Sequence, residues 1–237
     1  MELNANTARQ YTDIVIDNLE GGYYHPDLKQ HLKNGDKMGI SGETMYGIDF
    51  QHGGSLGQSQ FAQEVHNFFA PYVAQVVDNA SAMRIYNDKA NGKKVAPADY
   101  GQRWRQMAAD LMLQQMQQNI KYLTPEARKM VLSDPALFLQ FWYACWNGSG
   151  NFQKFAEVMN RAYNDGERDP QTINCLILAE RYKKPWNTTS KIDAITAEWY
   201  GKPNNLPGTT TQKKSSLLPV LLIGGAILLI YLKTKDK

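Results

Sequence analysis

A glutamate followed by two glycines stands near the start of the chain, in the run LEGGYYHP from Leu19 to Pro26. Apolar residues recur at helical spacing before it, which predicts a helix over residues 8–20 that ends beside Glu20. A carboxyl group there faces the negative end of the helix dipole, and partial burial would disfavour its charge further. Glu20 is therefore a candidate general acid, with a solvated helix-end carboxylate as the alternative.

A second segment, SGETMYGID from Ser41 to Asp49, lies in the most glycine-rich part of the chain. Its turn residues predict a small hairpin or three-stranded ribbon near Asp36 to Phe50, beside the end of the first helix. Gly21 and Gly22 would let the chain reverse after that helix without side chains crowding the carboxyl group. The helix end and the ribbon are thus the elements that would position Glu20.

Together the two segments resemble the paired motifs of glycoside hydrolase family 108. That family comprises peptidoglycan-cleaving N-acetylmuramidases of the lysozyme-like superfamily. The resemblance covers about residues 8–185, and it is specific only in the first two motifs. The similar segments are Glu20 to Tyr23 (EGGY), Gly42 to Ile48 (GETMYGI), Ala82 to Asp88, Asn147 to Gly150, and Asp165 to Ile173. The stretch of about residues 147–185 resembles the family's peptidoglycan-binding segment.

The resemblance implies a lysozyme-like fold and cleavage of the β-1,4 bond between N-acetylmuramic acid and N-acetylglucosamine. Glu20 matches the catalytic acid, which would protonate the glycosidic oxygen. Thr44 matches a hairpin threonine that helps to hold a water near the anomeric carbon. Tyr46 and Gly47 would shape the floor of the cleft, and Asn147 matches a residue of the asparagine and glycine turn.

Two tyrosines beside the acid have two interpretations. Tyr23 and Tyr24 could stack on sugar faces, and they could equally be packing residues at a helix end. The aromatic residues Trp142, Tyr143 and Trp146 recur at helical spacing, which favours core over cleft.

One position departs from the family pattern. The family usually has an aspartate five residues before the threonine, and Gly39 stands there. Asp36 is the candidate replacement, and other carboxylates nearby are Asp27, Glu43 and Asp49. A hydrolase needs such a second carboxylate to activate water or attack the sugar. Without it, Glu20 would act alone, as in lytic transglycosylases, or the chain would be an inert wall-binding or structural virion protein.

The rest of the chain to residue 200 reads as helical. Three capping pairs, Thr124-Pro125, Asp134-Pro135 and Asp169-Pro170, mark helix starts. The fold class is therefore α+β, mostly α, with one lysozyme-like catalytic domain over residues 1–200. The predicted helices lie near residues 58–79, 98–123, 125–132, 135–146, 152–164, 170–183 and 190–199.

Composition excludes several classes of protein. The chain has 237 residues, 43% of them hydrophobic, and a mean hydropathy of −0.51, which excludes a polytopic membrane protein. Residues 1–200 carry 20 basic and 22 acidic side chains, so we expect no nucleic-acid partner. Cys145 and Cys175 form no CxxC pair and are predicted to be buried thiols. The four histidines lack ligand spacing, so we expect no metal site and no cofactor.

After the domain, residues 201–216 are polar and predict a flexible linker. The run Leu217–Leu232 contains sixteen uncharged residues, which would span ~24 Å as a helix against a hydrocarbon core ~30 Å thick. Flanking lysines can extend to the head groups. We therefore predict a C-terminal transmembrane helix followed by a basic tail at 233–237, with a buried core helix as the alternative.

The start of the chain, MELNANTARQ, shows no secretory signal pattern. A C-terminal anchor without a signal would leave the domain on the cytoplasmic side of a cell membrane, away from peptidoglycan. We therefore expect the internal membrane of a lipid-containing bacteriophage virion, with capsid or other virion proteins as possible neighbours. The alternative is a lysis enzyme at the host inner membrane.

Overall fold

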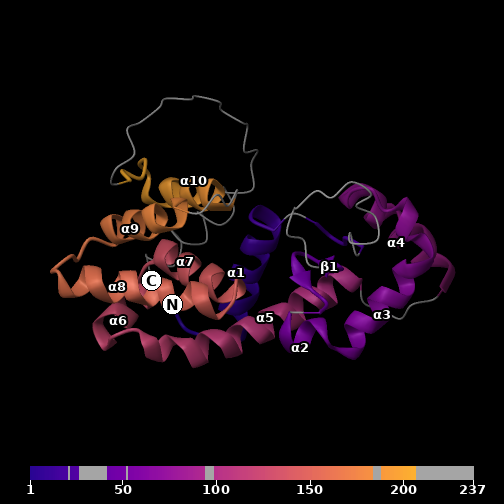
Figure 1. The fold of residues 1–237 in the computed structure, drawn as a ribbon, viewed down its shortest axis with the longest axis horizontal. Coiled ribbons are helices and arrows are strands. Elements are labelled where there is room, and N and C mark those ends of the chain that lie inside the picture. The colour runs from indigo at the N-terminus through magenta and orange to yellow at the C-terminus, as the bar shows by residue number, and fades with distance from the viewer. Residues whose placement is uncertain (21, 27–41, 52, 94–98, 184–187, 207–237) are drawn as a thin grey trace, which may run out of the picture. The chain divides into compact units, whose positions relative to one another are not determined.

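The computed structural model describes residues 1–20, 22–26, 42–51, 53–93, 99–183 and 188–206. These residues form many helices and one small antiparallel sheet (Figure 1), so the predicted α+β, mostly α class is confirmed. Met1–Pro207 form one compact unit and Gly208–Lys237 a second, and the second lies outside the described residues.

The elements follow one another in this order along the chain: α1 Ala5–Asn18, β1 Thr44–Met45, β2 Ile48–Asp49, α2 Gly54–Gly57, α3 Gln60–Phe69, the 3₁₀ helix η2 Ala70–Gln75, α4 Asn79–Lys93, α5 Tyr100–Asn119, the 3₁₀ helix η3 Ile120–Tyr122, α6 Pro125–Ser133, α7 Pro135–Trp146, α8 Ser149–Asn164, α9 Pro170–Tyr182 and α10 Thr188–Tyr200.

The three predicted capping pairs start helices as expected. The side chains of Thr124, Asp134 and Asp169 each accept a hydrogen bond from a backbone N–H three residues ahead, at 2.9–3.3 Å. In each case proline occupies the first helical position. Local chemistry therefore fixes where α6, α7 and α9 begin.

The prediction was wrong between residues 58 and 93. The single helix expected over 58–79 is divided into α3 and η2, because Pro71 sits at the start of the new 3₁₀ helix. The spacing of apolar residues also predicted no helix over most of α4. Residues Ala82 to Asp88 of α4 had been noted only as one of the segments that resemble the family. Asp78 starts α4 by accepting the Ser81 N–H at 2.7 Å, which the asparagine-rich sequence of α4 did not reveal.

Two clusters of buried side chains hold the unit together. The first contains α7, which is buried on nearly all sides, together with parts of α1, α6, α8, α9 and α10. The second surrounds the sheet with α3, α4 and the first half of α5. Helix α5 contributes Trp104 to the second cluster and Met116 to the first. In Figure 1 it runs from beside α2 toward α6. Leu111 of α5 and Trp146 pack against both clusters.

Cys145 and Cys175 are both buried and unpaired thiols, which confirms their prediction. Burial raises the pKa of the Cys145 thiol to about 12, so it stays protonated and unreactive at neutral pH. Trp142 and Tyr143 are also buried, as their helical spacing predicted, and Trp146 is half-buried.

The compact unit extends past the boundary predicted at residue 200. Residues 201–206 were expected to belong to a linker, but Asn204 binds groups of α9 and α10. Its Nδ2 donates to Asp193 Oδ1 and Thr196 Oγ1, each at 2.9 Å, and its Oδ1 accepts from Asn174 at 3.3 Å. The physical reason is that the Asn204 amide joins the network of polar groups that already links α9 and α10.

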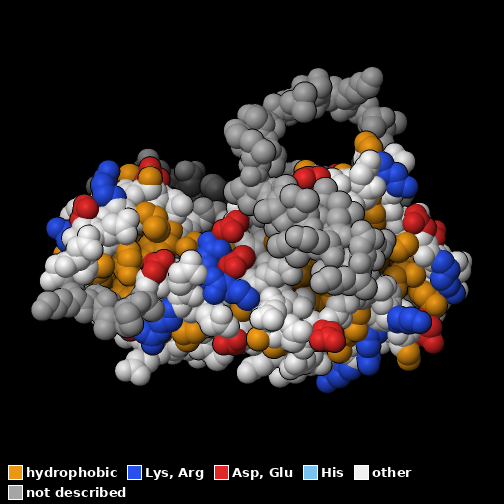
Figure 2. All heavy atoms as spheres, turned by 180° about the vertical axis from the view of Figure 1, so that it is seen from behind, with side chains coloured by type: hydrophobic (Ala, Val, Ile, Leu, Met, Phe, Trp, Pro, Cys, Tyr) orange, Lys and Arg blue, Asp and Glu red, His pale blue; other side chains and the backbone are white. Residues whose placement is uncertain are grey.

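The predicted transmembrane run Leu217–Leu232 and the tail 233–237 lie outside the described residues. Among the helices that the structure does describe, none combines the length and the apolar character that crossing a membrane requires. On the face shown in Figure 2, acidic and basic side chains are interspersed, without a broad basic area.

Candidate active site

Glu20 lies directly after α1. The helix ends at Asn18, Leu19 caps it, and the N–H groups of Leu19 and Glu20 both donate to the carbonyl oxygen of Val15, at 2.8 and 2.9 Å. The predicted helix end beside Glu20 is therefore confirmed, although Glu20 stands just beyond the last turn rather than within it. Its side chain is half-buried.

The segment GETMYGID forms the predicted hairpin. Strand β1 pairs with β2 so that Thr44 faces Asp49 and Met45 faces Ile48. Tyr46 and Gly47 make the two-residue turn, with φ of 49° and 77°. Positive φ at both positions is the geometry of a type I′ turn, which fits the twist of a hairpin.

Backbone hydrogen bonds attach the first motif to this hairpin. His25 and Thr44 exchange two bonds of 2.9 Å, and the Tyr46 N–H donates to Gly22 O at 2.8 Å. Residues 22–25 therefore lie beside β1 through an isolated bridge, outside the span of residues 36–50 in which the sequence predicted the hairpin or ribbon.

The Glu20 carboxylate packs against the hairpin turn at Gly47. A Cβ atom on Gly47 would overlap Glu20 Oε2, and the positive φ independently favours glycine there. The two motifs are thus in contact where the Glu20 carboxylate packs on the backbone of Gly47, which has no side chain.

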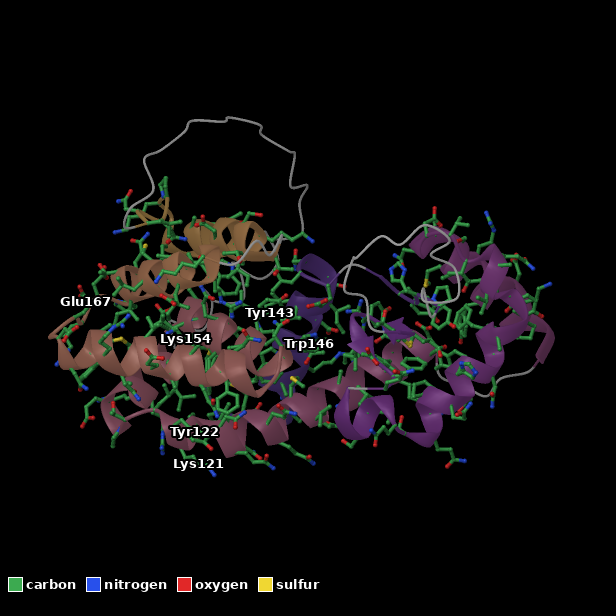
Figure 3. All side chains as sticks on the ribbon, viewed as in Figure 1. Lys121, Tyr122, Tyr143, Trp146, Lys154 and Glu167 are labelled. Atoms are coloured by element: carbon green, nitrogen blue, oxygen red, sulfur yellow. The ribbon has the colours of Figure 1, made fainter. Side chains whose placement is uncertain are left out.

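Tyr143 and Lys191 complete the surroundings of Glu20. The Tyr143 hydroxyl donates to Glu20 Oε1 at 3.1 Å, and Lys191 Nζ donates to the neighbouring Leu19 O at 3.4 Å. Figure 3 shows Tyr143 and Trp146 on the side of α7 toward α1. Tyr143 is buried, so the pattern that predicted a core residue also concealed a partner of Glu20.

Burial raises the pKa of Glu20 above its ordinary value of 4.5, while the Tyr143 hydrogen bond and the charge of Lys191 partly oppose the rise. Desolvation, one of the two effects that the sequence suggested, is therefore the main cause of the raised pKa. A raised pKa keeps a larger fraction of Glu20 protonated near neutral pH, which a general acid requires.

We predict that Tyr143→Phe raises the pKa of Glu20 further, because it removes a hydrogen bond that favours the charged form. The alkaline limb of the pH–activity profile should move to higher pH, since the acid then stays protonated longer. Tyr200→Phe is the matched control, because it removes a 2.9 Å hydrogen bond from Tyr200 to another carboxylate, Asp134. An alkaline limb that stays in place, or moves equally in the control, would contradict this role for Tyr143.

Arg105 of α5 holds the hairpin turn beside α1. Its guanidinium donates to Asp13 Oδ1 at 2.9 Å and to Asp17 Oδ1 at 2.7 Å, and it lies 4.7 Å from the Tyr46 ring centroid. Asp13 and Asp17 are one turn apart on α1. This spacing is the only feature of the sequence that could have indicated a shared basic partner such as Arg105. Arg105 is thus a positioning residue that the sequence did not reveal.

The second carboxylate was predicted at Asp36, and Asp36 and Asp27 lie outside the described residues. Glu43 accepts a 2.7 Å hydrogen bond from the Tyr24 hydroxyl and lies 2.7 Å from His66 Nδ1, so its carboxylate is bound toward α3. Asp49 Oδ1 accepts the Gln51 N–H at 2.6 Å. Thr44 is half-buried on β1, one strand position before Met45.

Tyr23 and Tyr24 pack inside the second cluster and are each 1% exposed. The Tyr24 ring stacks on Phe69 at 4.0 Å between centroids, and the Tyr23 ring meets Tyr46 edge to face at 5.6 Å. Their ring faces are occupied by protein, which favours the packing interpretation over sugar stacking.

Asn147 caps α7 and is half-buried. Its Nδ2 donates to Tyr143 O at 2.8 Å, so the amide fixes the end of α7 beside the tyrosine that binds Glu20.

Comparison of the chain with family models, with curated proteins and with solved structures finds no match. In the described part of the chain, no three histidine, cysteine, aspartate or glutamate side chains come together as metal ligands. The chemistry that this arrangement offers is proton donation by a partly buried carboxyl group.

Proposed function

We propose that this chain is a peptidoglycan-cleaving glycosidase of lysozyme-like fold that cuts the β-1,4 bond between N-acetylmuramic acid and N-acetylglucosamine. The observation that carries the proposal is the burial of the Glu20 carboxyl group against Gly47, where the two motifs of the resemblance meet. A helix-end carboxylate in open solvent, the alternative interpretation, would have an ordinary pKa.

In this proposal protonated Glu20 donates its proton to the glycosidic oxygen as the C1–O bond breaks. The leaving sugar then departs as a neutral alcohol, and positive charge develops at the anomeric carbon. Tyr143 orients the carboxyl group through Oε1, while the absence of a side chain at Gly47 leaves the space that Oε2 occupies. General acid catalysis of this kind contributes about 10²- to 10⁴-fold.

Two fates of the anomeric carbon are compatible with one acid. In hydrolysis, water adds to C1, with Asp36 as the proposed second carboxylate and Thr44 holding the water. In transglycosylation, the 6-hydroxyl of the same muramic acid attacks C1 and forms a 1,6-anhydro ring. The contacts of Glu43 with Tyr24 and His66 turn its carboxylate toward α3, so Asp36 stays the proposed second carboxylate. We propose hydrolysis as the leading chemistry.

The products decide between these reactions. We expect the full chain, incubated with purified sacculi, to release muropeptides with reducing muramic acid ends, which mass spectrometry separates from anhydro products by the mass of one water. Predominantly anhydro products would contradict hydrolysis. Unchanged products and rate in Asp36→Asn would remove that residue from the mechanism.

An inert wall-binding or structural protein is the alternative from a different class. The specific observation in its favour is Gly39, which stands where the family usually has an aspartate. It predicts that the chain sediments with sacculi without releasing soluble fragments at any pH from mildly acidic to neutral.

Membrane anchoring through Leu217–Leu232 remains part of the proposal, supported by sixteen residues without a charge. Such an anchor would hold the catalytic unit near a lipid surface, with a virion membrane as the proposed location. Partition of the full chain into liposomes, compared with a chain that ends at residue 207, tests the anchor separately from the activity.

A further inference from the structure

A pocket of about 200 Å³ lies among α8, α9 and α10, outside the hairpin region. Its walls are apolar at Phe155, Val158 and Ile177, and its polar groups include Lys154, Glu180 and Arg181. Binding sites for drug-sized ligands are commonly ~300–1,000 Å³, so this pocket suits one small group rather than a sugar chain. Figure 3 shows Lys154 on α8, separated from Tyr143 on α7.

Arg181 is the unusual member of this pocket. In the described part of the chain its only polar contact is a long hydrogen bond to Gln140 O at 3.4 Å, and its guanidinium lies 5.2 Å from the Tyr143 ring centroid. Burial lowers its pKa to about 10, so it remains charged at neutral pH. A largely desolvated guanidinium ordinarily pairs with a carboxylate.

The other charges of the pocket already have partners. Glu180 lies 2.6 Å from Lys183 Nζ and 3.6 Å from Lys154 Nζ, and Lys154 also binds Glu157 at 3.1 Å. Glu180 is therefore compensated by two lysines, and among the described ion pairs it has none with Arg181. Among the described residues of the pocket, the positive charge of Arg181 is the one without a carboxylate partner.

The start of α8 adds to this preference for an anion. Gly148 precedes the helix with φ of 90°, and as a glycine it supplies no side-chain cap to α8. Gly150 and Asn151, in this first turn, line the pocket. The start of the 16-residue helix α8, its positive end, therefore borders the same pocket as Arg181.

We propose that this pocket binds the carboxylate end of a short peptide whose last residue is small and apolar, with Arg181 as its charged partner. The guanidinium can bind both carboxylate oxygens, and the apolar wall can accept a methyl group such as that of alanine. A bare inorganic anion would leave the apolar wall unused.

The pocket lies next to the candidate active site through one side chain. The Tyr143 ring lies under Arg181 and its hydroxyl binds Glu20, so a single aromatic residue separates the two sites. If the proposed function holds, the peptide attached to muramic acid is the source of the carboxylate, and the pocket selects glycan that carries peptide. The binding itself does not depend on cleavage.

The test is calorimetric titration of the full chain with N-acetyl-alanyl-alanine, in its D and L forms, with the C-terminal amides of both, and with acetate. We expect at least one acid form to bind. Its amide and the Arg181→Met variant should each bind about 10- to 100-fold more weakly, as the loss of a charge-assisted contact predicts. Acetate should bind more weakly than the peptide, because it lacks the apolar contact.

Arg161→Met is the matched control, because Arg161 is an exposed arginine of α8 outside the pocket and its loss changes the net charge equally. Equal weakening by both variants, acid and amide of equal affinity, or acetate as tight as the peptide would overturn the proposal. If Arg181→Met fails to fold, hydrogen exchange of the unaltered chain decides. Peptide-dependent protection in residues 148–158 and 177–183 supports the site, and its absence there overturns it.

Binding and cleavage separate the two proposals. Peptide binding by an unaltered chain that releases nothing from sacculi would support the pocket while the proposed function fails. Release of muropeptides by a chain that binds no peptide would leave the function and overturn the pocket.

Discussion

Glu20→Gln should lower the rate of muropeptide release from sacculi by about 100-fold or more, because the amide cannot donate a proton to the glycosidic oxygen. The substitution preserves the size of the side chain, so its contact with the turn at Gly47 should persist. Release of soluble muropeptides over time, at matched protein concentration, measures the effect.

Glu126→Gln is the control, since Glu126 is an exposed glutamate in the first turn of α6. It should retain the rate of the unaltered chain. A Glu20→Gln variant that keeps most of the activity would show that another group is the acid.

The same variant should have a thermodynamic signature. Burial raises the pKa of Glu20 in the folded state, so the folded chain binds more protons than the unfolded chain between 4.5 and the raised value. Stability therefore falls as pH rises through that window. Glutamine does not ionise, so Glu20→Gln should not lose stability in this way. The midpoint of unfolding of the variant should exceed that of the unaltered chain at neutral pH, and the two midpoints should converge in acid. A higher stability of the variant at neutral pH would show that its lower activity comes from the missing acid and not from misfolding.

Gly47→Ala should cost about 10- to 100-fold in activity, because the added Cβ overlaps Glu20 Oε2 and must displace the carboxyl group. It should also lower the free energy of unfolding by about 1–2 kcal/mol, the cost of a left-handed conformation for a residue with a Cβ. Muropeptide release and chemical denaturation measure the two effects separately.

Gly201→Ala provides the matched comparison. Gly201 has φ of 66°, close to the 77° of Gly47, and a Cβ there would meet nothing within 4 Å. The control should therefore share the backbone cost and keep its activity. Equal activity in the two variants would show that Gly47 does not constrain the carboxyl group.

Local signals predicted most of the fold and failed where the chain lacked them. The capping pairs at Pro125, Pro135 and Pro170 placed three helix starts correctly, because a cap and a fixed φ are properties of adjacent residues. The division at Pro71 was predictable from the same rule and was missed. The unit continues to residue 206 because Asn204 binds distant polar groups, which no local pattern announces.

The candidate site likewise has one part that the sequence predicted and one part that it did not. The motifs around Glu20 and Gly47 predicted that a helix end and a hairpin would meet, and the structure brings them into contact. For Tyr143 the sequence favoured core over cleft, since helical spacing indicates burial and not which carboxylate a hydroxyl contacts. Arg105 and Lys191 act from other helices, so their roles depend on tertiary packing that the sequence pattern does not contain.

The residues that surround Glu20 also determine at what stage of protein synthesis its buried environment can form. Tyr143 lies 123 residues after Glu20, and Lys191 lies 172 residues after Leu19. The ribosome synthesises Glu20 early, and it synthesises Tyr143, whose hydroxyl binds Glu20, only after most of the unit has been made. The nascent chain therefore carries an ordinary, solvated glutamate until α7 and then α10 have emerged and packed against α1. Catalytic competence should appear late in translation, as a property of the nearly complete unit.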